Sequence, residues 1–121
     1  MAHGGTCMTV SFLGAARVVD AYNMMGPVKA ALESAVRYAA VEPGPKSISV
    51  HALSPGPLKT RAASGLASFD ALVGDAASRA PTRHLDTIED VGAYAAFRSS
   101  QEAWNVTGAV HQIGGGYNIV G

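Results

Sequence analysis

Apolar residues change their spacing several times along the chain, and each change predicts a different element. Residues 6–13 and 47–53 are short apolar and β-branched runs bounded by glycine or proline, which is typical of buried strands. Between them, apolar residues recur at helical spacing from residue 20 or 21 to about residue 41. Asp20 is a candidate N-cap for this helix, and the Pro-Gly-Pro run at 43–45 predicts its end.

The second half of the chain repeats this alternation. Residues 61–79 are rich in Ala and Ser and predict one or two short helices, residues 87–99 predict a further helix, and residues 109–113 predict a last strand. Strands that alternate with helices pair in parallel through right-handed crossovers. We therefore predict an α/β fold with about three parallel strands, flanking helices on both faces and two exposed sheet edges.

Composition and charge narrow the possible functions. The 121 residues include nine basic and nine acidic residues, so the formal net charge is zero. This balance, without a clustered basic face, argues against nucleic-acid binding. No apolar run approaches the roughly 18 residues of a membrane helix. The single cysteine, Cys7, is predicted to be a buried thiol, and a cytoplasmic protein is the simplest interpretation.

Tyr22 and Lys29 are the pair of residues with the clearest chemical potential. Seven residues make nearly two helical turns, which would place both side chains on one helix face about 10 Å apart. A tyrosine beside a lysine ammonium can donate to a developing enolate. Spacing alone leaves a second interpretation open, a packed tyrosine and a solvated lysine. The four histidines show no metal-ligand spacing with Cys7 or with carboxylates, so no metal site is predicted.

The sequence around this pair resembles one enzyme family. The segment YNMMGPVKAALESAVRYAA resembles the active-site helix of NADH-dependent enoyl-[acyl-carrier-protein] reductases, in the short-chain dehydrogenase/reductase superfamily. SISVHALSPGPLKTRAASGLASFDAL is similar to their strand and substrate loop, and TIEDVGAYAAF and VTGAVHQIGGGYNIVG to their last helix and last strand. GGTCMTVSFLGAARVVDAY resembles the strand and loop that precede the tyrosine. The resemblance is to the C-terminal half of these enzymes.

The resemblance implies a role for each matching residue. Tyr22 would hydrogen-bond the thioester carbonyl of a trans-2-enoyl substrate on acyl carrier protein and stabilise the enolate formed when NADH delivers hydride. Lys29 would hold the nicotinamide ribose hydroxyls and bias the tyrosine electrostatically. The other implied cofactor-binding residues are Gly56, Pro57, Leu58 and Thr60, and the implied substrate-binding residues are Phe12, Met25, Ala62, Ala63, Leu66 and Phe69.

The chain also departs from the family pattern. Phe12 replaces a second tyrosine, Pro27 lies inside the predicted active-site helix, Ser49 and His51 replace an Arg-x-Asn pattern, and Gly114 replaces an Asp. Pro27 would kink the helix if more than one turn precedes it. Met1 aligns with an internal methionine of the pattern, and no glycine-rich turn connects a strand to a helix.

These features lead to the expectation that residues 1–121 form a single, partial Rossmann-like domain. It would be the catalytic and substrate-binding half of a doubly wound parallel sheet, without the N-terminal dinucleotide-binding half. The expected function is NADH-dependent enoyl reduction in fatty acid biosynthesis, impaired by truncation. The alternative is a non-catalytic association module that docks on a full-length reductase, because family members form tetramers. The expected partners are the carrier-bound substrate and a second copy or a full-length reductase.

Overall fold

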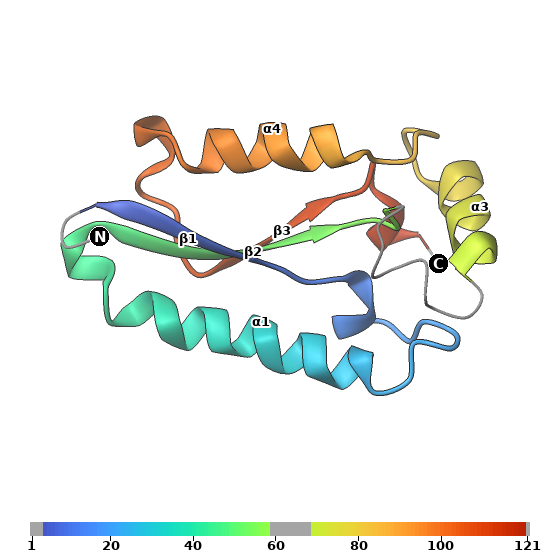
Figure 1. Ribbon diagram of the computed structural model, residues 1–121, viewed down its shortest axis with the longest axis horizontal. Coiled ribbons are helices and arrows are strands. Elements are labelled where there is room, and N and C mark those ends of the chain that lie inside the picture. Colours follow the sequence, from blue (N-terminus) through green and yellow to red (C-terminus); the bar gives the residue numbers. More distant parts are fainter. Residues whose placement is uncertain (1–3, 59–68, 121) are drawn as a thin grey trace.

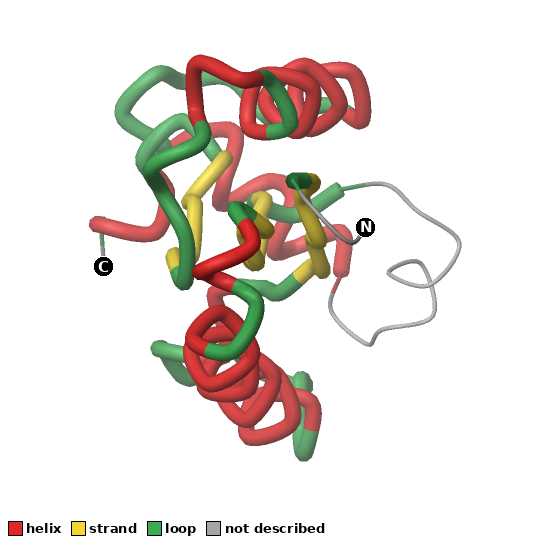
Figure 2. Tube along the Cα trace, turned by 90° about the vertical axis from the view of Figure 1, so that its left-hand side faces the viewer, coloured by secondary structure: helices red, strands yellow, loops and turns green. Residues whose placement is uncertain are grey.

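Three parallel strands form the centre of the computed structural model, which describes residues 4–58 and 69–120. The elements of these residues are β1 (Gly5–Val10), α1 (Met25–Val41), β2 (Ile48–Pro55), α3 (Phe69–Arg79), α4 (Ile88–Arg98) and β3 (Ala109–Ile113). The strand order is β1-β2-β3, with Gly5 beside Ile48 and His51 beside Ala109. Figure 1 shows α1 on one face of the sheet and α4 on the other, and Figure 2 shows the same layers along the strands. The predicted α/β fold is confirmed.

The central strand is the buried one, and the first strand is not. Every residue of β2 except Val50 is buried, whereas β1 alternates between exposed and half-buried positions. β1 lies at an edge of the sheet and pairs, within the described residues, with β2 alone. The prediction that Cys7 is a buried thiol is therefore wrong, because this residue lies on an edge strand and is exposed.

The long helix α1 begins at Met25 rather than at residue 20 or 21. Ala21 and Asn23 have left-handed φ angles of 59° and 56°, so the chain turns before the helix starts. Tyr22 consequently lies in the turn and not on the helix. Pro27 falls in the first helical turn, where a backbone N–H has no intrahelical partner, so it does not interrupt the helix.

The second half of the fold follows the sequence pattern closely. The Thr87 hydroxyl accepts a hydrogen bond from the Asp90 N–H at 3.1 Å, and the Asp90 carboxylate accepts one from the Thr87 N–H at 2.9 Å. This capping box starts α4 where the sequence predicts. β3 has the predicted bounds, and α3 falls inside the predicted 61–79 region, of which 61–68 lie outside the described residues. Within the described ranges, no helix is long and apolar enough to cross a membrane.

Candidate functional site

The carboxyl ends of the three strands lie at one edge of the sheet, and several predicted site residues follow them directly. Phe12 comes two residues after β1, and Gly56 and Pro57 come directly after β2. Figure 1 shows α3 beyond the same edge. Open α/β sheets bind ligands outside the carboxyl ends of their strands, so this edge is the candidate site.

Tyr22 is held at this edge as a buried ring. It exposes 7% of its surface, and its ring packs against Phe12 with centroids 5.3 Å apart and planes tilted by 60°. Gly14 is necessary for this packing, because the Tyr22 ring fills the space that a Cβ at position 14 would take. Burial raises the pKa of the Tyr22 hydroxyl. The phenol is therefore protonated at neutral pH and can act as a hydrogen-bond donor.

A cavity of about 610 Å³ opens beside Tyr22. Its walls are the loop of residues 14–23 and the start of α1, with Gly26, Pro27 and Ala30 contributing from the helix. Gly26 allows this helix to approach the loop, since a Cβ there would meet the Gly14 carbonyl oxygen at 3.0 Å. Met25, predicted to line the substrate pocket, is 40% exposed and does not line this cavity.

Lys29 reaches the end of β1 from the second turn of α1. Its Nζ donates a hydrogen bond to the Val10 carbonyl at 3.0 Å. An ammonium group has three donors, so two remain for a ligand. The raised pKa of Tyr22 is caused by burial. The structure therefore places both residues near the carboxyl end of β1, while their predicted chemical roles stay predictions.

The start of the predicted cofactor loop is fixed by Asp86. The Gly56 N–H donates to the Ile113 carbonyl at 2.8 Å and to the Asp86 carboxylate at 3.1 Å. A Cβ at position 56 would lie 2.8 Å from the other Asp86 oxygen, so a larger residue would displace this carboxylate. Burial raises the pKa of the Asp86 carboxyl. The sequence analysis did not single out Asp86. Its position directly before the Thr87 N-cap is the feature that could have drawn attention to it.

The remaining predicted site residues are only partly described. Pro57 is buried, Leu58 is half-buried, and Phe69 is buried as the first residue of α3. Thr60, Ala62, Ala63 and Leu66 lie outside the described residues. Phe12 packs against Tyr22 and also against the core cluster beside α3. Phe12 therefore links the Tyr22 loop to the helix that follows the predicted substrate segment.

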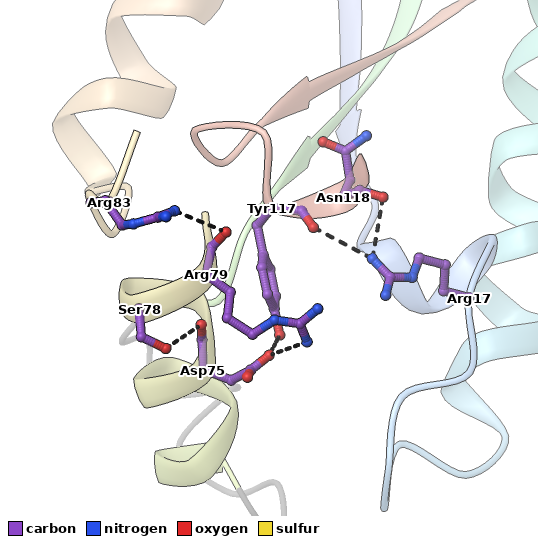
Figure 3. Close-up of polar contacts among 7 residues, drawn as sticks. All are labelled: Arg17, Asp75, Ser78, Arg79, Arg83, Tyr117 and Asn118. Atoms are coloured by element: carbon purple, nitrogen blue, oxygen red, sulfur yellow. Dashed lines mark hydrogen bonds and ion pairs between the residues drawn. The ribbon is translucent and has the colours of Figure 1, made fainter. Parts of the chain in front are cut away.

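Hydrogen bonds and an ion pair hold the C-terminal segment at the carboxyl edge of the sheet (Figure 3). The Tyr117 hydroxyl donates to the Asp75 carboxylate at 2.5 Å, and Asp75 also pairs with Arg79 at 3.5 Å on α3. Arg17, in the loop after β1, donates to the backbone carbonyl of Asn118 at 3.2 Å. These contacts join three segments that are far apart in the sequence. The sequence analysis did not predict these contacts, although Tyr117 directly follows a glycine run.

The glycine run after β3 packs closely against the segment that follows α3. Gly115 and Gly116 have left-handed φ angles of 63° and 88°, and side chains there would meet Thr82 and Pro81. A short 3-10 turn, Tyr117–Ile119, follows instead of an α-helix. Glycine here serves close packing. In the part of the chain that the structure describes, no group of three or more His, Cys, Asp or Glu is placed to hold a metal.

Comparison with known proteins assigns the family. The family model described as enoyl-(acyl carrier protein) reductase matches residues 1–118. The chain is 41% identical over 121 residues to the enoyl-[acyl-carrier-protein] reductase [NADH] FabI of Rickettsia prowazekii (strain Madrid E), covering 100% of this chain and 46% of that protein. It is 43% identical to the enoyl-[acyl-carrier-protein] reductase [NADH] 1 of Rhizobium meliloti (strain 1021), covering 100% and 44%.

Solved structures agree with this assignment. The Bacillus cereus enoyl-acyl carrier protein reductase, solved with NADP+ and indole naphthyridinone, superposes with a TM-score of 0.95 at 41% identity, over 100% of this chain and 47% of that one. The reductase of Anaplasma phagocytophilum, solved in complex with NAD, gives 0.90 at 36% identity, over 100% and 44%. The chain thus spans about half the length of the relatives it matches. It belongs to the enoyl-(acyl carrier protein) reductase family.

Proposed function

We propose that this chain supplies the proton-donor and substrate side of a cytoplasmic enoyl reductase site. The reaction is the reduction of trans-2-enoyl thioesters on acyl carrier protein to acyl thioesters with NADH, in fatty acid biosynthesis. The observation that carries the proposal is Tyr22, a buried and protonated phenol beside a cavity at the carboxyl edge of the sheet. The names of the similar proteins, which are NADH-dependent reductases, support the substrate and cofactor.

The described residues fit the nicotinamide end of the cofactor. Lys29 has two ammonium hydrogens left for ribose hydroxyls, and the Gly56 turn, held by Asp86, brings backbone to the edge where the strands end. When bound, NADH supplies the hydride for the substrate β-carbon. The Tyr22 hydroxyl donates a hydrogen bond to the thioester carbonyl oxygen, where negative charge develops.

The described residues offer no glycine-rich turn between a strand and an α-helix for a pyrophosphate. The domain that we propose is therefore partial. Residues 1–121 form a catalytic and substrate-binding half, and a dinucleotide-binding half has to be supplied to them. The isolated chain is then expected to bind NADH poorly and to turn over slowly.

The test follows NADH oxidation in a mixture of the chain, NADH and a short enoyl thioester. Tyr22→Phe removes the donor and keeps the ring, and loss of one such donor typically costs about 100- to 1,000-fold in rate. Tyr38→Phe is the matched control, because Tyr38 lies on α1 and is 81% exposed. Turnover that survives Tyr22→Phe contradicts the role of Tyr22. Full reductase-like turnover by the isolated chain contradicts the need for a second half.

A second candidate function is an association module. Val28, Tyr38 and Val41 are exposed on α1, and the outer edge of β1 pairs with no strand among the described residues. Apolar helix faces and open sheet edges favour association, with a second copy or with a full-length reductase. Co-elution with a full-length reductase, without turnover by the chain alone, favours this function. A monomeric chain that elutes separately excludes it.

A further inference from the structure

Arg98, the last residue of α4, is a buried cation that forms no ion pair with an acid among the described residues. It exposes 9% of its surface, and its Nε atom is buried with no hydrogen-bond partner in the described ranges. The guanidinium carbon lies 5.8 Å from the centroid of the Tyr94 ring and 5.1 Å from that of Phe97. Aromatic faces stabilise the charge but do not satisfy the N–H donors at the edge of the guanidinium. A buried charge of this kind normally has a counter-charge.

The titratable groups that face Arg98 do not supply that counter-charge. Beside the Tyr94 ring, they include His51 and His111, whose rings are joined by a 2.9 Å hydrogen bond between Nδ1 of His51 and Nε2 of His111. Burial and then the Arg98 charge lower the pKa of His51, and Arg98 also contributes to the lowered pKa of His111. Both imidazoles are therefore neutral at pH 7, and neither balances the Arg98 charge.

Arg98 lines a cavity of about 630 Å³ at the amino edge of the sheet, opposite the edge that holds Tyr22. The start of β1 and the end of α4 lie on this side of the molecule in Figure 1. Arg98 is the only charged residue among the described residues that line the cavity, and hydroxyl groups make up much of the wall. Ser49 donates its hydroxyl hydrogen to Thr6 at 3.3 Å, which leaves the Thr6 hydroxyl hydrogen for a ligand. Ser47, in the turn before β2, adds a second hydroxyl.

We propose that Arg98, Thr6 and Ser47 bind a small oxyanion, a carboxylate or a phosphate, in this cavity. The planar guanidinium fork matches the oxygens of either group, and the two hydroxyls donate to the remaining oxygens. Trp104, the single tryptophan of the chain, lines the same cavity and is a built-in reporter of binding. The site is independent of the reductase function proposed above, because it lies at the other edge of the sheet.

The test titrates the chain with sodium phosphate or sodium acetate while sodium chloride keeps the ionic strength constant. A saturable change in Trp104 emission is expected, with a dissociation constant of about 1 mM or below. Arg98→Leu is expected to abolish it, whereas Arg37→Leu, at an exposed position of α1, leaves it unchanged. A response to one anion identifies the ligand chemistry. No saturable response to either anion, or an equal response in Arg98→Leu, overturns the proposal.

A thermal measurement separates binding from loss of folding. Arg98→Leu removes an unpaired buried charge, so the variant is expected to fold and to unfold at a higher temperature than wild type in chloride. The effective anion, at about tenfold its dissociation constant, raises the midpoint of the wild-type chain by about 5 °C. The thermal midpoint of Arg98→Leu is expected to stay unchanged when the anion is added. Equal shifts in both proteins show a general salt effect and contradict the site.

Discussion

At the scale of single residues, Tyr117 shows how one hydroxyl joins distant segments. Its hydroxyl donates to Asp75 at 2.5 Å, and burial together with this hydrogen bond raises its pKa to about 12. We expect Tyr117→Phe to lower the free energy of unfolding by about 1–2 kcal/mol at pH 7, because the ring stays and only the hydrogen bond is lost. Urea unfolding measures the difference, with Tyr38→Phe as the exposed control.

The raised pKa of Tyr117 also makes the unfolding free energy depend on pH in the alkaline range. The folded pKa of Tyr117 lies above the unfolded value of 10.0, so its contribution to stability is present below pH 10 and is lost as pH rises towards 12. The decline in unfolding free energy above about pH 9.5 is therefore expected to be shallower in Tyr117→Phe than in wild type. Parallel declines in both proteins contradict the coupling between Tyr117 and Asp75.

At the scale of elements, the capping box of α4 is a test of local stability. Thr87 and Asp90 each satisfy the other's backbone N–H, so Thr87→Ala leaves an unpaired donor in the first turn. We expect this change to cost about 1 kcal/mol of unfolding free energy. Thr87→Ser keeps the side-chain oxygen and serves as the control. A loss in Thr87→Ser as large as in Thr87→Ala would show that the methyl group, and not the cap, stabilises the helix.

Elements with clear end signals were predictable from the sequence. The Thr-Ile-Glu-Asp segment at 87–90 marked the start of α4, and the glycine run at 114–116 marked the end of β3. The start of α1 was predicted too early, because apolar spacing continues through residues 20–25 while Ala21 and Asn23 adopt left-handed angles that periodicity does not reveal. The burial of β1 was overestimated for a related reason, since an apolar run cannot show which strand lies at the edge.

The site was predictable only in part. Family resemblance singled out Tyr22, and the structure adds that the ring is buried against Phe12 and Gly14. Asp86 lies 30 residues from Gly56 in the sequence, and Tyr117 lies 42 residues from Asp75. Contacts over such separations depend on how the layers pack, which local patterns do not specify.

At the scale of the whole molecule, a chain of polar groups connects β2, β3 and α4. The Tyr94 hydroxyl lies 2.8 Å from Nδ1 of His111, and Nε2 of His111 lies 2.9 Å from Nδ1 of His51. His51 is 0% exposed. Burial is the first cause of the lowered pKa of both histidines, followed by the charges of their neighbours. This layer of the fold therefore accommodates neutral imidazoles.

Acid is expected to loosen the packing of α4 on the sheet through these two histidines. Their folded pKa values lie below the unfolded value of 6.5, so the stability that they provide is present above pH 6.5 and is lost as pH falls below it. We expect the unfolding free energy to decrease as pH falls from 7.5 to 5.5, because the unfolded histidines take up protons that the buried, folded ones do not. Urea unfolding in buffers free of phosphate and acetate measures the slope without occupying the Arg98 site.

His51→Asn removes one titrating group and is expected to flatten the decline, whereas His84→Gln, at an exposed position, is not. An equally steep decline in His51→Asn would place the acid sensitivity outside this layer.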